Sequence, residues 1–317
     1  MIEITRTGKN PLVIDNPVMP AAGIFGYDGS AYSELIDLSK LGALVTNPIT
    51  WRGRRVARGP RLVSLPAGVL VHTGLPNPGL PRVVEQYGTR WKRGLLPVIV
   101  HIVATTPEDV VRCADVLDRC DGVAAIELGL HDQSTPADVE TMIGAVLDHT
   151  QLALLVRLPL YTAVGLARAA SDAGAGALVV AAPPRGTARD PLTGVLAGGR
   201  LYGPWLKAQA LRAVGQIAPI VEVPVIGSGG IHSPDDARDF LEAGAVAVQV
   251  DTLVWTQPHM LEVIARNLGG LELTRATGAL ADEWQPGMGQ TMFQQRQNRP
   301  TLLDDDTAAD PPDRLPE

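Results

Sequence analysis

Short apolar runs alternate with amphipathic segments along this chain from Pro17 onward, and this alternation constrains the fold more than any other feature. Apolar runs of strand length, each followed by a helical pattern, are typical of parallel strands joined by crossover helices. The runs cover residues 18–22, 43–48, 96–102, 124–130, 153–158, 177–182, 223–227 and 246–250. Eight strand–helix units predict an α/β fold of the closed (β/α)8 TIM barrel type, with an open doubly wound sheet as the alternative.

The helices are expected between these strands, at residues 31–38, 81–93, 107–119, 136–148, 163–173, 204–217, 234–243 and 258–268. Several begin with a proline in the first turn, where the missing N–H has no intrahelical partner to lose. Gly174 and Gly244 each follow a helical pattern, as expected of a residue that ends a helix. The working face of such a barrel lies at the carboxyl ends of its strands.

A chain of 317 residues fits one such barrel, and no second domain is required. Residues 17–272 are assigned to the barrel. Residues 1–16 precede it and are expected to form a short hairpin at its base. Residues 273–317 are rich in polar residues and proline with little periodicity, which predicts a mobile tail. The long connections 50–71 and 183–202 fall at the working face, where long loops usually carry function.

Charge and hydropathy limit the function classes. The formal net charge of −7 disfavours a protein that binds nucleic acid through its overall field. No apolar stretch is long enough to span a bilayer, and the first residues lack the apolar run of a signal peptide, so we expect a cytoplasmic protein with a small-molecule substrate and no membrane partner. Cys113 and Cys120 are interpreted as two core residues on one helical face.

The ends of the last two predicted strands carry a phosphate-binding pattern. One strand opens into Gly229 and Gly230, and the next ends at Asp251 and Thr252. Backbone N–H groups in such turns bind phosphate in barrel enzymes, and a helix beginning near Ser233 adds positive potential. A tight turn without a ligand is the structural alternative. The pattern therefore favours a ligand that carries a phosphate.

Five motifs, at residues 17–27, 41–46, 74–79, 126–128 and 203–204, resemble the dihydroorotate dehydrogenase family in order and spacing, together with the two strand ends above. The chain is most similar to class 1B, the soluble class that works with a separate iron–sulfur flavin subunit. The resemblance implies an FMN-dependent oxidoreductase that oxidises a CH–CH bond with hydride transfer to the flavin. The FMN-binding residues that it implies are Ala22, Gly23, Asn47, Arg157, Gly203, Gly229, Gly230, Asp251 and Thr252.

Three of these positions depart from the family pattern. Asn47 stands where the family has a flavin-side lysine after the second strand. Arg157 stands where the family has a lysine beside the flavin, and it keeps the positive charge that stabilises reduced flavin. Asp251 places a carboxylate beside the phosphate. Because the family makes this contact through the backbone, the Asp251 side chain is expected to point away.

The substrate side departs further. The family removes its proton with a cysteine or serine after the fourth strand, and that position holds Asp132, preceded by His131. Either residue is a candidate base, Asp132 if burial raises its pKa, and an exposed acidic loop is the alternative. The asparagines that surround the family's pyrimidine align with Val71, Gly129, Ser134 and Ala182. The residues expected to contact substrate are His72, Gly74, Leu75 and Ser134. We therefore predict an altered substrate pocket.

Three functions remain open. The first is an FMN oxidoreductase with an altered pocket, the second a catalytically inactive paralogue with an assembly or regulatory role, and the third a barrel lyase or isomerase that uses Asp132 and His131 on a phosphorylated substrate. No metal is expected, since His72, His101 and His131 follow no ligand spacing. The resemblance suggests a homodimer and a further partner, either an electron-transfer subunit or a homologous barrel.

Overall fold

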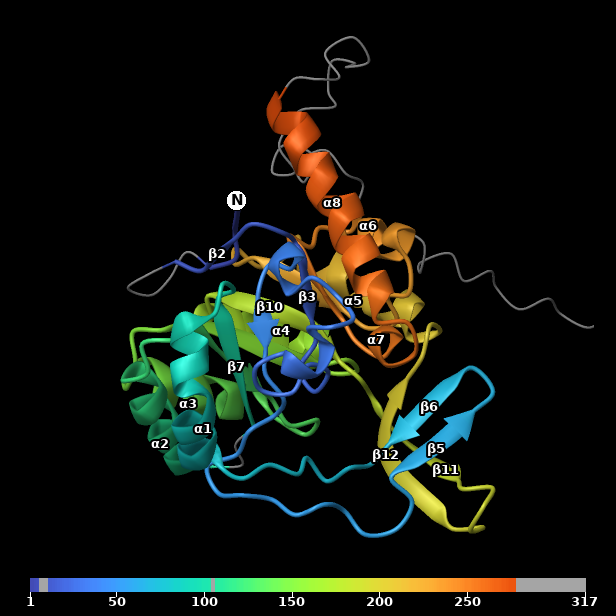
Figure 1. Cartoon of the computed structure of the whole chain (residues 1–317). Coiled ribbons are helices and arrows are strands. Elements are labelled where there is room, and N and C mark those ends of the chain that lie inside the picture. The colour runs from blue at the N-terminus through green and yellow to red at the C-terminus, as the bar shows by residue number, and fades with distance from the viewer. Residues whose placement is uncertain (6–10, 104–105, 278–317) are drawn as a thin grey trace, which may run out of the picture. The chain divides into compact units, whose positions relative to one another are not determined.

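The computed structural model describes residues 1–5, 11–103 and 106–277. In these residues eight parallel strands form one sheet that curls into a nearly closed barrel, in the order β3, β14, β13, β10, β9, β8, β7, β4 (Figure 1). The strands are β3 (Val18–Pro20), β4 (Leu44–Val45), β7 (Val98–Val103), β8 (Ala125–Gly129), β9 (Ala153–Pro159), β10 (Ala177–Ala182), β13 (Val225–Ser228) and β14 (Ala247–Val250). The predicted barrel is confirmed, and every predicted strand has an observed counterpart.

A glycine lets the two end strands of the sheet meet. The Gly42 N–H donates to the Val18 carbonyl at 2.9 Å, which links the segments that carry β3 and β4. A Cβ atom at position 42 would lie 2.0 Å from the Asn16 carbonyl oxygen. Any other residue would therefore force the segments apart.

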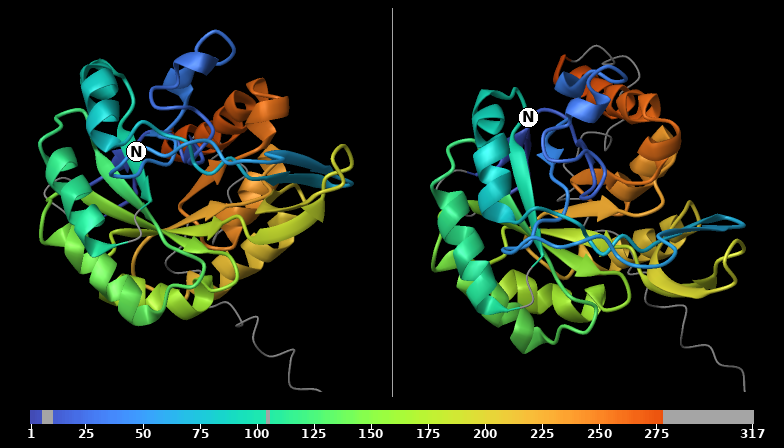
Figure 2. Two further views of the ribbon diagram at one scale, coloured as in Figure 1. Left: turned by 90° about the horizontal axis from the view of Figure 1, so that it is seen from below. Right: turned by 60° about the horizontal axis from the view of Figure 1, so that its bottom comes forward.

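The helices surround the strands (Figure 2). They are α1 (Leu80–Arg93), α2 (Pro107–Asp118), α3 (Pro136–Leu147), α4 (Ala163–Asp172), α5 (Leu206–Ile217), α6 (Pro234–Glu242), α7 (Leu253–Thr256) and α8 (His259–Thr277). The side chains of Thr106, Thr135 and Ser233 cap α2, α3 and α6 by accepting a hydrogen bond from the backbone three residues on. Proline follows each cap, so three of these connections begin their helix in the same way.

The predicted helix at residues 31–38 is wrong. This segment holds only two 3-10 turns, η1 (Ser30–Tyr32) and η2 (Leu38–Lys40). The Asp37 carboxylate accepts hydrogen bonds from the Ser39 N–H at 3.0 Å and the Ser39 hydroxyl at 2.6 Å. Such local side-chain bonds compete with the helical pattern and favour a turn.

The last helix is longer than predicted. It extends to Thr277, so residues 273–277 are helical and do not belong to the predicted tail; residues 278–317 lie outside the described part. Gly269 lies inside this helix and allows close packing, because a Cβ atom there would lie 2.7 Å from the Asn16 amide nitrogen. That amide donates to the Ala265 carbonyl at 2.8 Å and holds α8 on the barrel.

Both long connections at the working face contain strands that the sequence did not predict. They form two hairpins, one from β5 (Leu62–Leu65) and β6 (Gly68–Val71) and one from β11 (Arg185–Arg189) and β12 (Leu196–Tyr202). The hairpins join into one antiparallel sheet in the order β11, β12, β6, β5, which projects from the barrel (Figure 1). Val63, Leu70 and Ala197 form a small core on this projecting sheet.

A two-stranded hairpin closes the base of the barrel. Its strands β1 (Ile2–Glu3) and β2 (Val13–Ile14) pair antiparallel. Ile4, Leu12 and Ile14 are buried in one cluster with side chains from the lower barrel interior. The interior residues of this cluster include Met19, Val45, Ile99, Ala125, Leu155, Val179, Ile226 and Ala247. The lower interior is therefore apolar and packed.

Candidate active site

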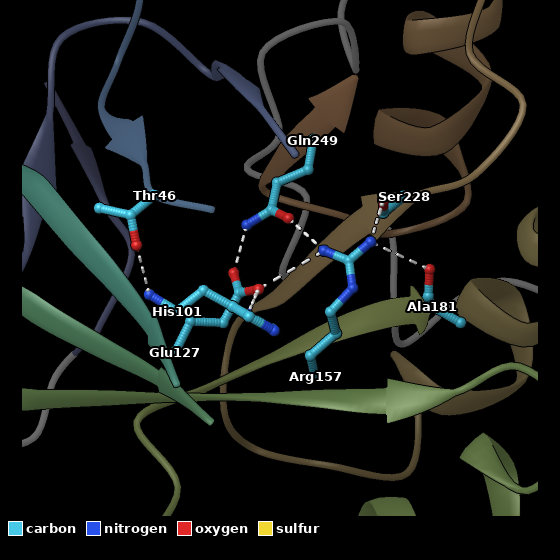
Figure 3. A network of polar contacts seen from close by, with 7 residues as sticks. All are labelled: Thr46, His101, Glu127, Arg157, Ala181, Ser228 and Gln249. Atoms are coloured by element: carbon cyan, nitrogen blue, oxygen red, sulfur yellow. Dashed lines mark hydrogen bonds and ion pairs between the residues drawn. The ribbon is translucent and has the colours of Figure 1, made fainter. Parts of the chain in front are cut away.

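A polar layer follows the apolar layers at the carboxyl ends of the strands. Because inward-facing residues of a strand recur every second position, the residue two places after an apolar interior residue also faces inward. These residues are His101 on β7, Glu127 on β8, Arg157 on β9, Ser228 on β13 and Gln249 on β14. All five are buried and joined by hydrogen bonds (Figure 3). Only Arg157 was predicted as a site residue.

Glu127 is the centre of this layer. One carboxylate oxygen lies 2.7 Å from His101 Nδ1 and 3.5 Å from an Arg157 nitrogen, and the other accepts from the Gln249 amide at 2.6 Å. Complete burial alone would raise the pKa of Glu127, but His101, Arg157 and Gln249 more than offset it and lower the pKa to about 2. Glu127 is therefore a fixed negative charge inside the barrel.

Arg157 is held in place from several strands. Its guanidinium donates to the Gln249 side-chain oxygen at 2.5 Å and to the Ser228 hydroxyl at 3.0 Å. A further contact joins it to the Ala181 carbonyl at 3.5 Å (Figure 3). Since arginine stays protonated at all relevant pH values, this side chain supplies a permanent positive charge just below the barrel mouth.

His101 forms an oriented pair with Glu127. The carboxylate contacts Nδ1, and the His101 backbone N–H donates to the Thr46 hydroxyl at 3.0 Å. No hydrogen bond to Nε2 is found among the described residues, and the side chain is 6% exposed. A carboxylate that fixes one ring nitrogen leaves the other available for proton transfer.

Gly129 provides the space for the His101 ring. A Cβ atom at position 129 would lie 2.9 Å from His101 Nε2 and 3.0 Å from Cε1. The imidazole thus fills the region that a side chain at 129 would enter. Its position was predictable only from the register, because Ile99, two residues before it, faces the lower interior.

Asp132 does not have the environment that a base needs. The Arg185 Nε donates to its carboxylate at 2.9 Å and an Arg200 nitrogen at 2.5 Å, and both arginines belong to the β11–β12 hairpin. Partial burial alone would raise the pKa of Asp132, but the two arginines lower it overall. Asp132 was predicted as a base only if burial raised its pKa, and its pKa is lowered instead. His131 is exposed, and its Nδ1 accepts from the Gln133 N–H at 3.3 Å.

The predicted phosphate end lies where β13 and β14 end side by side. Gly229 and Gly230 have φ of 120° and 71°, values that glycine adopts more readily than other residues. The buried carboxylate of Asp251 turns to the neighbouring backbone and accepts from the Thr252 N–H at 2.6 Å. The Thr252 N–H is therefore already occupied.

The remaining predicted residues follow the strand ends. Ala22 and Gly23 come after β3, and Asn47 comes after β4, where its side chain accepts from the Gly26 N–H at 3.2 Å. Gly203 follows β12, and a Cβ atom there would lie 2.4 Å from the Ala67 carbonyl oxygen.

The predicted substrate residues lie in two loops. His72 follows β6, and its backbone N–H donates to the Arg61 carbonyl at 2.8 Å. Gly74 and Leu75 come next, both with positive φ, and Leu75 is the only non-glycine residue with positive φ in the described ranges. Ser134 follows β8, and its N–H donates to the His131 carbonyl at 3.1 Å.

The described residues contain no group of three or more His, Cys, Asp or Glu side chains placed to hold a metal ion. No helix among them has the length and apolar character needed to cross a membrane.

A barrel with buried polar groups at the carboxyl ends of its strands has the arrangement of a barrel enzyme. Comparison with known families narrows this class. A family model described as dihydroorotate dehydrogenase matches residues 11–271, and the chain belongs to this family. It is an oxidoreductase of the dihydroorotate dehydrogenase type.

The chain is similar over most of its length to several curated proteins. It is 37% identical over 273 residues to the dihydroorotate dehydrogenase B (NAD(+)) catalytic subunit of Desulforamulus reducens, covering 80% of this chain and 88% of that protein. It is 36% identical over 288 residues to the protein of the same description from Trichlorobacter lovleyi, covering 86% and 93%. The predicted resemblance to the class 1B enzymes is confirmed.

Proposed function

We propose that this chain is an FMN-dependent oxidoreductase that accepts hydride from a substrate other than dihydroorotate, or from dihydroorotate only slowly. The observation that carries the proposal is the buried polar layer with Arg157 fixed at the barrel mouth. Bound FMN would supply the hydride acceptor. A permanent cation below it would stabilise the negative charge of the reduced ring.

The chain has residues that fit both the ring end and most of the phosphate end of FMN. Arg157 and Asn47 lie at the strand ends where a flavin ring would be held. Gly229 and Gly230 offer a turn without side chains, and Ser233 begins the nine-residue helix α6 beside it. Asp251 opposes the phosphate, through its charge and through its bond to the Thr252 N–H.

For the proton that leaves the substrate we propose His101 in place of Asp132. His101 has an unpartnered Nε2 within the described structure and a carboxylate that orients its ring. Asp132 is paired with two arginines and its pKa is lowered, which weakens it as a base. His131 stays the second candidate, because it lies in the same loop and is open to solvent.

The substrate pocket supports a changed specificity. Val71, Gly129, Ser134 and Ala182 supply no side-chain amide at the positions where the family resemblance implies asparagines. Each lost polar contact costs about 1–3 kcal/mol of binding free energy, so three or four losses would remove most of a micromolar affinity. Poor turnover of dihydroorotate follows from this count.

The partners are proposed from the relatives, which are catalytic subunits. We propose a homodimer that passes its electrons to a separate electron-transfer subunit in the cytoplasm. The exposed Arg52, Arg54, Arg55 and Arg58 beside the mouth provide a basic surface for an acidic partner.

The visible spectrum of the purified full-length chain, before and after addition of FMN, tests the proposal. We expect a flavin band that stays with the protein through gel filtration and that dihydroorotate reduces slowly under anaerobic conditions. Absence of the band in both samples would exclude FMN dependence and favour the inactive paralogue or the lyase. Rapid reduction by dihydroorotate would instead refute the altered pocket.

A further inference from the structure

The segments that follow β13 and β14 bring the groups of the proposed phosphate site side by side. The register pairs Ser228 with Gln249, so the segments that follow, 229–233 and 251–252, leave the barrel side by side. Ser233 caps α6 by accepting from the Asp236 N–H at 3.1 Å. An anionic ligand end placed here would lie beside the backbone of the glycine turn and the start of a nine-residue helix.

Asp251 places its own negative charge at this site. The residue is 3% exposed, and one carboxylate oxygen accepts from both the Thr252 N–H at 2.6 Å and the Thr252 hydroxyl at 3.2 Å. The carboxylate thus takes donors that a phosphate would otherwise use.

The charged groups around Asp251 do not neutralise it through a direct bond. Arg157 from β9 acts on it from a distance but is hydrogen-bonded within the polar layer, and Tyr202 from β12 is its other titratable neighbour. His232 also acts on it, and His232 Nδ1 is a buried atom without a partner in the described structure.

Lys207 is the cation linked to His232 through Asp236, and its charge is already paired. Asp236 accepts from the His232 backbone N–H at 2.9 Å and from Lys207 at 2.5 Å. Lys207 is paired with Asp239 as well, at 2.6 Å. The amine is thus already paired with two carboxylates and adds little positive charge for a phosphate brought next to Asp251.

We propose that FMN binds at this site only with uptake of a proton by Asp251, its phosphate displacing the carboxylate from the Thr252 N–H. This inference rests on the proposed function, since it concerns the phosphate end of the same flavin. Burial already raises the pKa of Asp251. A phosphate dianion beside it favours the neutral acid further, because like charges in a buried site oppose ionisation.

Because proton uptake is linked to FMN binding, the affinity for FMN must depend on pH. Between the pKa of Asp251 in the free protein and its higher pKa in the complex, FMN affinity falls up to tenfold for each pH unit gained. The phosphate of FMN is largely dianionic above about pH 7, so its own titration contributes little there. Riboflavin, which lacks the phosphate, should bind without this dependence.

The experiment is a fluorescence titration of flavin-depleted protein with FMN and with riboflavin from pH 7 to 9. Calorimetry in buffers of different ionisation enthalpy counts the protons taken up. We expect wild type to take up protons with FMN and not with riboflavin. Asp251→Asn should bind FMN at least tenfold more tightly at pH 8 and lose the pH dependence.

Two variants control for other charges. Asp235→Asn removes an exposed acid from the first turn of α6, where Asp235 pairs with Arg238. It should leave unchanged the slope of FMN affinity against pH. His232→Asn should also keep the slope. A slope that survives Asp251→Asn, or that disappears with His232→Asn alone, overturns the proposal, as does equal pH dependence of riboflavin binding. If no variant binds either flavin, the proposed function itself fails.

Discussion

At the scale of single residues, the site depends on one buried charge. Glu127 contacts His101, Arg157 and Gln249, which come from three other strands. Removing one partner of a buried pair leaves an uncompensated charge, and this costs more than the pair contributes. The polar layer therefore responds as a unit to substitution.

We expect Glu127→Gln to lower the free energy of unfolding by about 3–5 kcal/mol, because Arg157 loses its buried counter-charge. Urea denaturation measures this loss. The exposed Glu85 on α1 offers the control, and Glu85→Gln should change stability by less than about 0.5 kcal/mol. Equal stability of the two variants would contradict a central role for Glu127.

Glu127 should also make the folded state less stable at low pH. Its folded-state pKa of about 2 lies below the ordinary value of 4.5, so its contribution is present above pH 4.5 and is lost as the pH falls toward 2. The size of this contribution is about 3 kcal/mol. In Glu127→Gln, this part of the acid sensitivity should be absent.

At the scale of elements, the loop after β8 is tied to the projecting sheet. Asp132 bonds Arg185 and Arg200, which stand on paired positions of β11 and β12. The residue predicted as a base is thus an anchor between a barrel loop and a hairpin. Two ion pairs to one partly exposed carboxylate add only about 1 kcal/mol after solvent screening, so the effect is local.

We expect Asp132→Asn to increase hydrogen exchange of the β11 and β12 amides several-fold while the melting temperature stays within about 2 °C. Arg189→Ala is the matched control, since Arg189 lies on the same hairpin and donates only to its own turn at Gly194. If both variants exchange alike, Asp132 is not the anchor.

The helices and strands that could be predicted are those whose pattern is contained in one continuous stretch of sequence. Eight strands and seven helices follow from apolar periodicity, proline at helix starts and capping residues such as Thr135. The projecting hairpins were missed because their pairing joins distant segments, Arg200 with Val71 among them. The segment at 31–38 was misassigned because a turn around Asp37 replaces the helix.

The site was predicted less completely for a related reason. Arg157 and the glycine turn stand out in the sequence, whereas Glu127, Ser228 and Gln249 look like isolated polar residues in apolar strands. Their meeting depends on the register of five strands around a closed barrel. The available signal was the two-residue period, which places each of them above an apolar interior residue.

At the scale of the whole molecule, the base of the barrel is filled by residues that precede the first barrel strand. Ile14 is 2% exposed and packs with interior residues of the barrel strands, while Val13, its neighbour on β2, is 39% exposed. The hairpin therefore belongs to the barrel core although it is not part of the β–α repeat.

We expect Ile14→Ala to cost about 2–5 kcal/mol and to lower the melting temperature of the whole barrel in a single transition. Val13→Ala on the same hairpin should change the melting temperature by less than about 2 °C. Differential scanning calorimetry distinguishes these results from a separate, earlier melting of the hairpin, which would show that the base is an independent unit.

The projecting sheet also sets a sequence of events during synthesis. Strand β6 pairs with β12, about 130 residues later in the chain. At about 5–20 residues per second, the ribosome leaves the β5–β6 hairpin with an open edge for roughly 6 to 25 s. An unpaired edge is a template for association with other nascent chains. The projecting sheet at the mouth of the barrel is thus open to misassembly until β12 has been made.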